Sequence, residues 1–303
     1  MTRILPFLRK PWHQKTLSLE VRFKRLWHRV LPSAPLPVRL SFGAWWLCRN
    51  DACGDAVFLY GYEDAERRFV QHLLREQMTV IDAGAHQGFY TMLASKRVGR
   101  SGRVYAFEPS PRQQRWLRLH LKLNRCDNVT VESFALADGQ GESTLFEALG
   151  RDTGCSSLRQ PVVEDPVRPV PVQTITLDRY LELRSIPRVD FVKLDVEGAE
   201  LAVLKGADRL LQQPRRPVFL IETQDLRTRT WGYSTSAIYD FLAARAYRWF
   251  CVQTDGALAP CPRARHHQYG NLVAGPAERL NELAPLIHPA APRTSPREGM
   301  PPC

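Results

Sequence analysis

Short apolar runs alternate with longer segments of helical spacing through the middle of the chain. Five apolar runs predict β-strands, at residues 79–82, 103–107, 129–134, 189–194 and 217–221. Apolar residues at helical spacing predict four helices, at residues 89–98, 111–123, 200–211 and 235–245. Strands that alternate with helices build a parallel sheet with helices on both faces, so the pattern predicts a doubly wound α/β fold.

A different pattern interrupts this alternation between the third and fourth predicted strands. Residues 142–147 and 167–176 favour a pair of β-strands, which would form a β-rich insert. The loop within the insert, residues 149–165, is long, and long loops in compact domains are usually functional. We therefore expect this loop to cover a ligand site at the sheet.

The first 35 residues form a basic leader ahead of the alternating pattern. Residues 17–31 have the spacing of an amphipathic helix. Its apolar side would carry Leu19, Phe23, Leu26, Trp27 and Val30. One interpretation is that this helix attaches to an anionic membrane surface or to a partner. The other is that it packs on the main domain and leaves a basic face in solvent.

Three segments are expected along the chain. They are the basic leader at residues 1–35, a main domain at 36–275 and a Pro- and Ala-rich tail at 276–303, which we expect to be disordered. Residues 40–62 are expected to form irregular strands that lead into the main domain. Helical spacing follows at residues 66–75.

The net charge of +11 belongs mainly to the N-terminal part of the chain. Residues 1–50 contain ten Lys and Arg against one acid, Glu20, which gives +9 and leaves +2 for the rest of the chain. A basic face for nucleic acid is therefore not expected on the main domain.

The cysteines and the hydropathy pattern bear on the compartment. The seven cysteines include no Cys-x-x-Cys spacing, so free thiols in a reducing cytoplasm are expected. No apolar run approaches the ~20 residues of a transmembrane helix. We expect a cytoplasmic protein, with peripheral contact at the inner face of the membrane through residues 1–35 as an option.

The first candidate site follows the first predicted strand, in Asp82-x-Gly84-x-x-x-Gly88. Glycines let the backbone approach a ligand where a side chain would clash. The strand carries an acid at its end, and this acid would repel a pyrophosphate but attract a cationic amino group. Glu108, at the end of the next strand, can accept two hydrogen bonds from a ribose diol. This combination favours S-adenosylmethionine, which carries an amino group and a sulfonium but no phosphate.

Two simpler interpretations apply to this loop. The glycines could serve only to pack a helix on a strand. His86 lies inside the loop, where it either contacts the ligand or forms a local hydrogen bond.

The second candidate site is the segment Asp190-Phe-Val-Lys-Leu-Asp-Val-Glu-Gly-Ala-Glu200. Because side chains alternate along a strand, Lys193 and Asp195 point to the same face. Asp195 is expected at the carboxyl end of the strand, where ligands bind in open α/β sheets. Glu197 follows in the loop, and Glu200 begins a helix, where an acid suits the helix dipole. The alternative for Asp195 and Glu197 is a solvated loop.

These residues together resemble the FkbM family of S-adenosylmethionine-dependent methyltransferases. The matching blocks are Tyr60-Gly-Tyr-Glu63, Val80-Ile-Asp-Ala-Gly-Ala-His-Gln-Gly88, Phe107-Glu-Pro109, Asp190-Phe-Val-Lys-Leu-Asp-Val-Glu-Gly-Ala-Glu200 and Leu204-Lys-Gly206. His86 stands where the family pattern usually has Asn, which keeps the polarity but changes a hydrogen bond. The leader and the tail lie outside the resemblance.

The resemblance implies a class I methyltransferase (Rossmann-like) fold, with a mostly parallel sheet of seven strands of which the last is antiparallel. Residues 247–253 and 271–273 could supply the final strands. It also implies O-methylation of a hydroxyl on a sugar, polysaccharide or secondary metabolite. The acceptor would thus be a small molecule or a glycan, and the oligomeric state stays open.

The resemblance and the motifs assign roles to particular residues. The cofactor-binding set is Asp82, Gly84, His86 and Gly88 at the methionine end, Glu108 at the ribose, and Phe134 and Ala135 beside the adenine. Asp195 is expected to orient or deprotonate the acceptor, with Lys193 and Glu197 assisting. An ordinary Asp, with a pKa of ~3.9, is a weak base. Burial beside Glu197 would raise the pKa of Asp195, whereas Lys193 would lower it.

A metal-assisted mechanism is the alternative at this site. Asp195 with Glu197 or Glu222 could bind Mg²⁺, which would acidify the acceptor hydroxyl directly. We favour metal-free chemistry.

Three rival functions fit parts of the sequence. A nucleic-acid methyltransferase would explain the basic leader, but the chain has no Asn/Asp-Pro-Pro-aromatic motif and no cysteine at the end of the fourth strand. Salt-dependent RNA binding that disappears on removal of residues 1–35 would favour that rival. A nicotinamide-dependent oxidoreductase is disfavoured by the glycine spacing. A non-catalytic binding module would bind the cofactor without methyl transfer.

Overall fold

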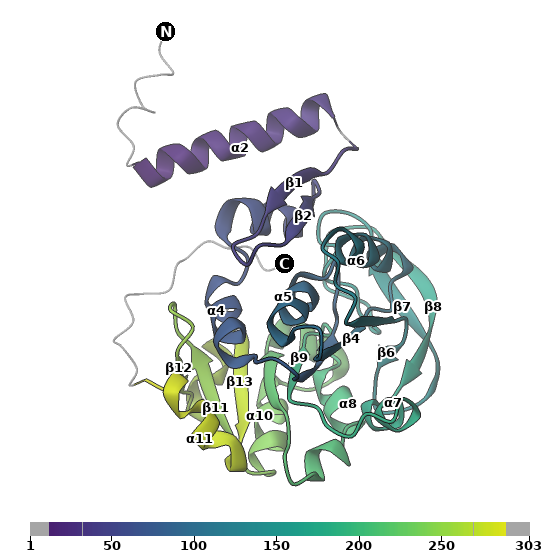
Figure 1. Cartoon of the computed structure of the whole chain (residues 1–303). Helices are drawn as coiled ribbons and strands as arrows, with labels where there is room; N and C mark the ends of the chain where they lie inside the picture. The colour runs from purple at the N-terminus through teal and green to yellow at the C-terminus, as the bar shows by residue number, and fades with distance from the viewer. Residues whose placement is uncertain (1–11, 32, 269, 289–303) are drawn as a thin grey trace. The chain divides into compact units, whose positions relative to one another are not determined.

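A computed structural model describes residues 12–31, 33–268 and 270–288 (Figure 1). The chain forms two compact units, Met1–Tyr62 and Glu63–Cys303. The second unit begins at Glu63, whereas the sequence pattern places the start of the main domain at residue 36.

The second unit is built on an eight-stranded sheet. Its strands, in the order in which they lie across the sheet, are β12 (Leu258–Pro260), β11 (Tyr247–Val252), β13 (Asn271–Pro276), β10 (Val218–Glu222), β9 (Phe191–Leu194), β3 (Thr79–Ala83), β4 (Arg103–Phe107) and β5 (Val129–Glu132). The strands from β10 to β5 pair in parallel, whereas β13 pairs antiparallel with both β10 and β11. The class I methyltransferase arrangement is thereby confirmed, with β12 as an additional edge strand.

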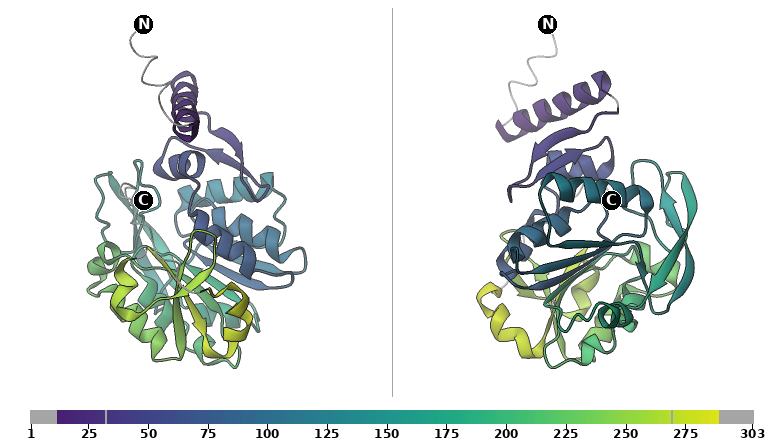
Figure 2. Two further views of the ribbon diagram at one scale, coloured as in Figure 1. Left: turned by 90° about the vertical axis from the view of Figure 1, so that its left-hand side faces the viewer. Right: turned by 45° about the vertical axis from the view of Figure 1, so that its right-hand side comes forward.

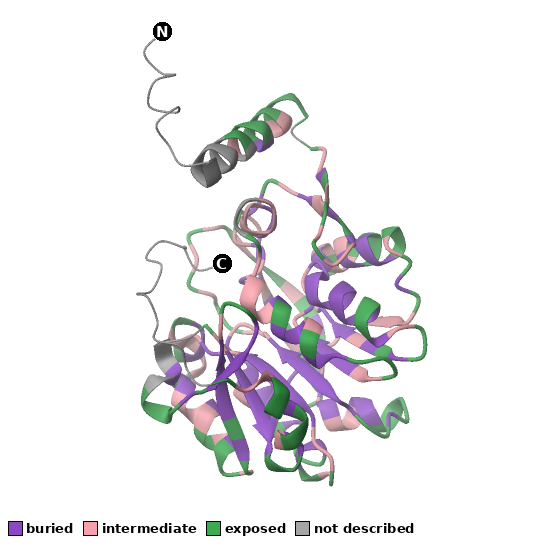
Figure 3. Cartoon of the chain, turned by 60° about the vertical axis from the view of Figure 1, so that its left-hand side comes forward, coloured by how far each residue is buried: buried purple, intermediate pink, exposed green. Residues whose placement is uncertain are grey.

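Helices cover both faces of this sheet (Figure 2). One face packs against α4 (Asp64–Leu73), α5 (Phe89–Val98) and α6 (Pro111–Leu123). The other packs against α7 (Leu177–Leu183), α8 (Glu200–Lys205) and α10 (Thr235–Ala243), whose apolar side chains join the main core cluster. The central strands are buried on both faces (Figure 3), which explains their continuous apolar runs.

Local sequence signals fix where the helices near the site begin. Ser110 caps α6 by accepting a hydrogen bond from the Gln113 amide, and Pro111 occupies the first helical position. Helix α8 is shorter than the 200–211 expected. It ends at Lys205, and a separate turn, η2 (Leu210–Gln212), follows.

The predicted β-rich insert is a three-stranded sheet of its own. Strand β7 (Gly141–Ala148) pairs antiparallel with β8 (Val167–Ile175), and the two-residue β6 (Ala135–Leu136) pairs parallel with β8. A small buried cluster holds this sheet together. The expected pair of strands is confirmed, with β6 as an addition.

The first unit contains more helix than the sequence pattern indicates. It comprises α2 (Trp12–Val30), β1 (Leu36–Arg39), β2 (Trp45–Cys48), α3 (Ala52–Asp55) and the π-helical turn η1 (Ala56–Tyr60). The expectation of irregular strands over residues 40–62 is wrong for its second half. Asp51 caps α3 there by accepting a hydrogen bond from the Gly54 amide.

Helix α2 buries a charged residue and exposes apolar ones. The Lys24 ammonium lies 2.6 Å from a carboxylate oxygen of Asp55, and Lys24 is only 3% exposed. Four residues of the expected apolar side are more than half exposed, Leu19, Phe23, Leu26 and Val30. The apolar side therefore does not hold this helix to the rest of its unit. Within the described ranges, no helix is both long and apolar enough to cross a membrane.

The C-terminal segment is ordered further than expected. Residues 277–286 form the short helices η5 (Ala277–Arg279), α11 (Leu280–Leu283) and η6 (Ala284–Leu286). The expectation of a disordered tail from residue 276 is wrong for this part, because Leu283 is fully buried and the Arg279 guanidinium donates to the Asp190 carbonyl. The last fifteen residues, for which we expect disorder, lie outside the described ranges.

Substitution of Gly84 tests how much the close packing of the loops at the carboxyl ends of the strands contributes to stability. Its φ of +82° is left-handed, and a Cβ built there would overlap the carbonyl oxygen of Asp195. We expect Gly84→Ala to lower the free energy of unfolding by at least about 2 kcal/mol in urea titrations. Gly139→Ala is the control, because a Cβ at Gly139 has open space around it. Equal small changes in both variants would contradict this account.

Candidate active site

Three loops meet at the carboxyl ends of β3, β4 and β9, and backbone hydrogen bonds join them. The amides of Gly84 and Ala85 donate to the Phe107 carbonyl at 3.0 and 2.9 Å. The Asp195 amide donates to the Ala83 carbonyl at 3.0 Å. The two candidate motifs therefore form one site, as their predicted positions at the strand ends imply.

Both glycines of the first loop serve the packing of protein against protein. Gly84 leaves room for the backbone of Asp195, and a Cβ at Gly88 would lie 2.5 Å from a methyl carbon of Leu117 on α6. The atoms that a side chain at either glycine would meet first are thus protein atoms, as the packing interpretation expects. It also explains how the loop comes to lie directly against the second motif.

Asp82 is a buried carboxylate in β3. It is 2% exposed and accepts a hydrogen bond of 2.5 Å from the Thr91 hydroxyl on α5. Burial, opposed by that hydrogen bond and by the charge of Lys193, raises its pKa to about 6. A nearby cationic ligand would stabilise the charged form that burial disfavours.

Glu108 is held by backbone amides at the end of β4. One carboxylate oxygen accepts from the Ser110 amide at 2.8 Å and the other from the His86 amide at 2.7 Å. Burial raises the pKa of Glu108 to about 7 even though both bonds oppose this. Each oxygen retains a further lone pair, so the group suits the hydroxyls of a ribose.

His86 has a left-handed backbone, with a φ of 48°. Asn and His both tolerate this conformation better than most residues, which accounts for His at a position where the family pattern has Asn. Its Nε2 atom lies 3.2 Å from the Thr153 hydroxyl in the insert loop. The local hydrogen bond that the sequence leaves open is therefore present, and cofactor contact by His86 stays a prediction.

Lys193 and Asp195 form a buried ion pair at the end of β9. The ammonium lies 2.7 Å from a carboxylate oxygen of Asp195 and 5.1 Å from the ring centre of Tyr90. Burial opposes the charge of Lys193, but Asp195 and Glu63 outweigh burial and raise its pKa. The Tyr90 hydroxyl in turn donates to Glu63 at 2.5 Å. Glu63 and Tyr90 thus belong to the site, and only Glu63 has a sequence signal, in Tyr60-Gly-Tyr-Glu63.

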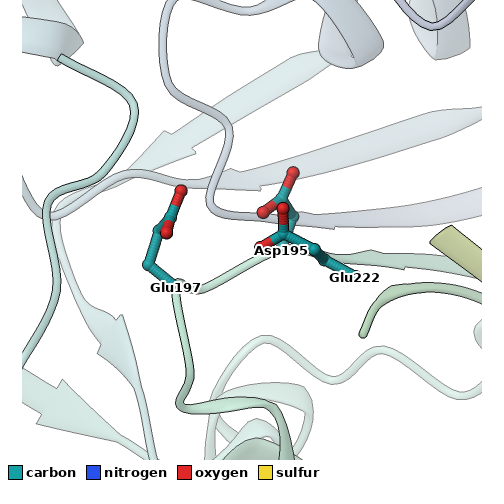
Figure 4. A group of neighbouring side chains, drawn as sticks. All are labelled: Asp195, Glu197 and Glu222. Carbon is teal, nitrogen blue, oxygen red and sulfur yellow. The ribbon is translucent and has the colours of Figure 1, made fainter. Parts of the chain in front are cut away.

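Asp195, Glu197 and Glu222 converge at the ends of β9 and β10 (Figure 4). One carboxylate oxygen from each lies within 4.8 Å of the others. Burial would raise the pKa of Asp195, but Lys193 and a hydrogen bond shared with Glu222 hold it below its usual value. Burial and the charge of Asp195 raise the pKa of Glu222 well above its usual value. The pKa values of the two neighbours are therefore shifted in opposite directions, and Asp195 is the more acidic of the two.

Glu197 is tied to residues that the sequence analysis did not single out. Its carboxylate lies 2.8 Å from the guanidinium of Arg227, which is buried after β10. Its carbonyl accepts from the Ser157 hydroxyl at 2.7 Å. Burial still raises the pKa of Glu197 well above its usual value, despite Arg227. Arg227 and Ser157 lie far from the motifs in sequence, and neither forms a recognisable pattern.

Glu200 has a structural role. It is 1% exposed, and one carboxylate oxygen accepts from the Val196 and Gly198 amides at 3.1 and 3.2 Å. These bonds close the loop that begins at Asp195. The Glu200 carboxylate therefore does more than interact favourably with the helix dipole, because it binds loop amides directly.

The two residues expected beside the adenine lie at the edge of the insert. Phe134 is partly buried against the main core, and Ala135 is buried with Leu145 and Val172 in the insert cluster. The Ala135 side chain is thus used for packing, and Ala135 pairs with Thr174 of β8. The assignment of both residues to the adenine stays a prediction.

The insert loop at residues 149–165 lies over the two motifs. Thr153 contacts His86, Ser157 contacts the Glu197 carbonyl, and Cys155 accepts a hydrogen bond of 3.0 Å from Arg227. The expectation that this loop covers the ligand site agrees with these contacts. The six cysteines of the described ranges are buried, and they form no disulfide there.

The charge of the site fits a cationic cofactor. The site contains the carboxyl groups of Asp82, Glu108, Asp195, Glu197 and Glu222. Two basic groups lie among them, Lys193 paired with Asp195 and Arg227 paired with Glu197. Buried acids in excess favour a ligand with positive charge. S-adenosylmethionine meets this requirement with its amino group and its sulfonium.

Comparison with known sequences places the chain in a family. The family model described as "Methyltransferase FkbM domain" matches residues 82–249, more than half of the chain. The chain belongs to this family of S-adenosylmethionine-dependent methyltransferases. The resemblance noted from the motifs is thereby confirmed.

Two methyltransferases are similar to this chain over part of their sequences. "Hexuronic acid methyltransferase AglP" of Haloferax volcanii is 27% identical over 155 residues, which are 51% of this chain and 59% of that protein. "Methyltransferase 1" of Beauveria bassiana is 27% identical over 146 residues, 43% of this chain and 58% of that protein. The chain therefore matches about three fifths of the length of these relatives. Among solved structures, an O-methyltransferase from Bacillus cereus in complex with SAH is 16% identical, with a TM-score of 0.40, over 69% of this chain and 78% of that one.

The raised pKa of Asp82 predicts that the stability of the ligand-free protein depends on pH. Because the folded pKa of about 6 exceeds the unfolded value of 3.8, stability is lost as the pH rises between these values. Asp82→Asn does not undergo this loss. We expect the ligand-free variant to be more stable than the parent by about 3 kcal/mol at pH 8, and not near pH 4. Urea titrations at both pH values measure this, with the exposed Asp138→Asn as control. A difference that does not change with pH would contradict the assignment.

Proposed function

We propose that this protein transfers the methyl group of S-adenosylmethionine to a hydroxyl oxygen, and that the hydroxyl belongs to a sugar or a sugar-containing molecule. The observation that carries the proposal is the Asp195 carboxylate, kept charged by Lys193 and placed against the glycine loop. A charged carboxylate at that position accepts a hydrogen bond from an acceptor hydroxyl.

The residues of the site divide between cofactor and acceptor. Asp82 and the loop from Gly84 to Gly88 would hold the methionine end of the cofactor, and Glu108 would hold its ribose. When bound, the cofactor supplies an electrophilic methyl carbon on a cationic sulfur. Asp195 would orient the acceptor hydroxyl in line with that carbon, and positioning of this kind supplies much of the rate in such a transfer.

The proton of the hydroxyl needs an acceptor as the new carbon–oxygen bond forms and the carbon–sulfur bond breaks. Asp195 is a weak base at its lowered pKa, but it shares a hydrogen bond with Glu222. Glu222 has the higher pKa of the two, so a proton that reaches Asp195 can pass on to Glu222 when Glu222 is deprotonated. We assign the orienting role to Asp195, proton acceptance to the Asp195–Glu222 pair, and electrostatic support to Lys193 and Glu197.

The charges already present support a metal-free reaction. The three carboxylates have the oxygen ligands that Mg²⁺ prefers. Two of them are paired with protein cations, Asp195 with Lys193 and Glu197 with Arg227. A divalent ion at this position would have to lie close to both cations, which disfavours its binding.

The proposal that the methyl acceptor is a sugar is supported by a similar protein. One protein with this similarity is named as a hexuronic acid methyltransferase. The site also lacks the features by which rival methyltransferases act, since Asp195 stands at the end of the fourth parallel strand in place of a nucleophilic cysteine.

The first prediction of this function concerns the cofactor. Calorimetric titration should show micromolar binding of S-adenosylmethionine and S-adenosylhomocysteine, with NAD silent. Glu108→Ala should weaken binding about 100-fold, because it removes two hydrogen bonds to a charged acceptor. The exposed Glu142→Ala is the matched control and should bind normally. A folded parent protein that binds neither adenosyl ligand would refute the proposal and favour an oxidoreductase or another binding module.

The second prediction concerns turnover. Asp195→Asn should keep cofactor binding within a few-fold but lower turnover by about 100-fold or more, because the amide cannot accept the proton. Release of S-adenosylhomocysteine would be measured with uronic acids, neutral sugars, phenols and a macrolide as acceptors, and with Asp138→Asn as control. Near-normal turnover in Asp195→Asn would remove this residue from the mechanism. Turnover that stops with EDTA and returns with Mg²⁺ would assign the three carboxylates to a metal instead.

A further inference from the structure

Helix α2 presents an apolar stripe and a basic stripe side by side. Leu19, Phe23, Leu26 and Val30 follow one another at spacings of four, three and four residues and are 54, 52, 59 and 67% exposed. At 3.6 residues per turn, they fall within an arc of about 60°. A stripe of this kind would normally be buried against another element.

Three arginines border this stripe. Arg22, Arg25 and Arg29 are all exposed and recur at spacings of three and four residues. They occupy the next part of the helix circumference, so cationic and apolar groups share one exposed side.

The opposite side of the helix is the one that contacts the protein. Lys24, about 140° around the helix from Leu19, is buried and paired with Asp55. Trp27, at the border of the apolar stripe, donates a hydrogen bond from its indole to the Ala34 carbonyl at 3.0 Å. These contacts fix the rotation of the helix within the unit formed by residues 1–62. The apolar stripe is therefore exposed because the helix is anchored by its other side.

We propose that this exposed side of α2 binds an anionic lipid surface, with the apolar stripe at the boundary of the acyl chains and the arginines at the headgroups. Helices that lie in a membrane interface combine an apolar face with basic residues and do not span the bilayer. The charge of the leader supports this occupant over a second copy of the chain. Residues 1–50 carry ten bases and one acid, so two copies would bring like charges together.

An anionic lipid surface also explains the exposed apolar and basic stripes together better than nucleic acid does. Nucleic acid would use the arginines but would have no use for four exposed aliphatic and aromatic side chains at helical spacing. The binding site would keep the enzyme at a membrane without any change at its active site. This inference does not depend on the methyl acceptor.

The test is sedimentation of the full-length protein with vesicles. We expect binding to vesicles of phosphatidylcholine mixed equally with phosphatidylglycerol, and at least tenfold weaker binding to phosphatidylcholine alone. Raising the salt to about 0.5 M should weaken binding to the anionic vesicles, because it screens the headgroup charge. Absence of binding to anionic vesicles at low salt would overturn the proposal.

Two variants and a matched control separate the contributions. Phe23→Ser with Leu26→Ser should lower the vesicle partition coefficient at least about tenfold. Arg22→Gln with Arg25→Gln and Arg29→Gln should do the same on anionic vesicles only. Leu119→Ser with Leu123→Ser changes two residues of α6 that are also exposed, 43 and 45%, and should bind like the parent. Cofactor binding, unchanged in all of these, reports that the fold is intact.

Two other outcomes would overturn the assignment to lipid. If the parent protein forms a dimer that the Phe23 and Leu26 substitutions dissociate, without vesicle binding, the stripe serves a second copy. If a labelled RNA binds in place of vesicles, and only the arginine substitutions abolish that binding, the basic stripe serves nucleic acid.

Discussion

The buried cation Lys193 lies among the acids at the centre of the active site. Lys193 lies in the central strand β9, with Asp82 as its neighbour in β3 and Asp195 two residues further along its own strand. Buried charges are tolerated only when they are paired. Lys193 therefore allows Asp195 to remain charged, and through Tyr90 it is linked to Glu63 at the start of α4. Without this residue, burial would raise the pKa of Asp195.

The backbone supplies the second constraint. Gly84, Glu197 and Gly198 all have left-handed conformations, and they lie where the glycine loop meets the loop after β9. Left-handed residues are concentrated at this point because two loops and a helix start must come together within a few ångströms. The insert loop then closes over them through the Ser157 hydroxyl and Thr153. The site is thus preorganised by main-chain geometry before any ligand is bound.

Much of this arrangement could be predicted from the sequence, for identifiable reasons. The strands β3, β4, β9 and β10 are continuous apolar runs, and each is followed by an acid, so their order and the position of Asp82, Glu108, Asp195 and Glu222 could be read directly. Arg227 and Tyr90 could not, because their roles arise from tertiary contacts with no local pattern. The leader shows the same limit. Its helical spacing was readable, but the burial of Lys24 depends on Asp55, thirty-one residues away.

The excess of carboxyl groups at the site has a consequence for the end of the catalytic cycle. Methyl transfer converts a sulfonium into an uncharged thioether, so the product carries one positive charge fewer than the cofactor, although it keeps its amino group. We therefore expect the acids of the site to contribute less to retention of the spent form than to binding of fresh cofactor. A difference of this kind would favour exchange of spent cofactor for fresh.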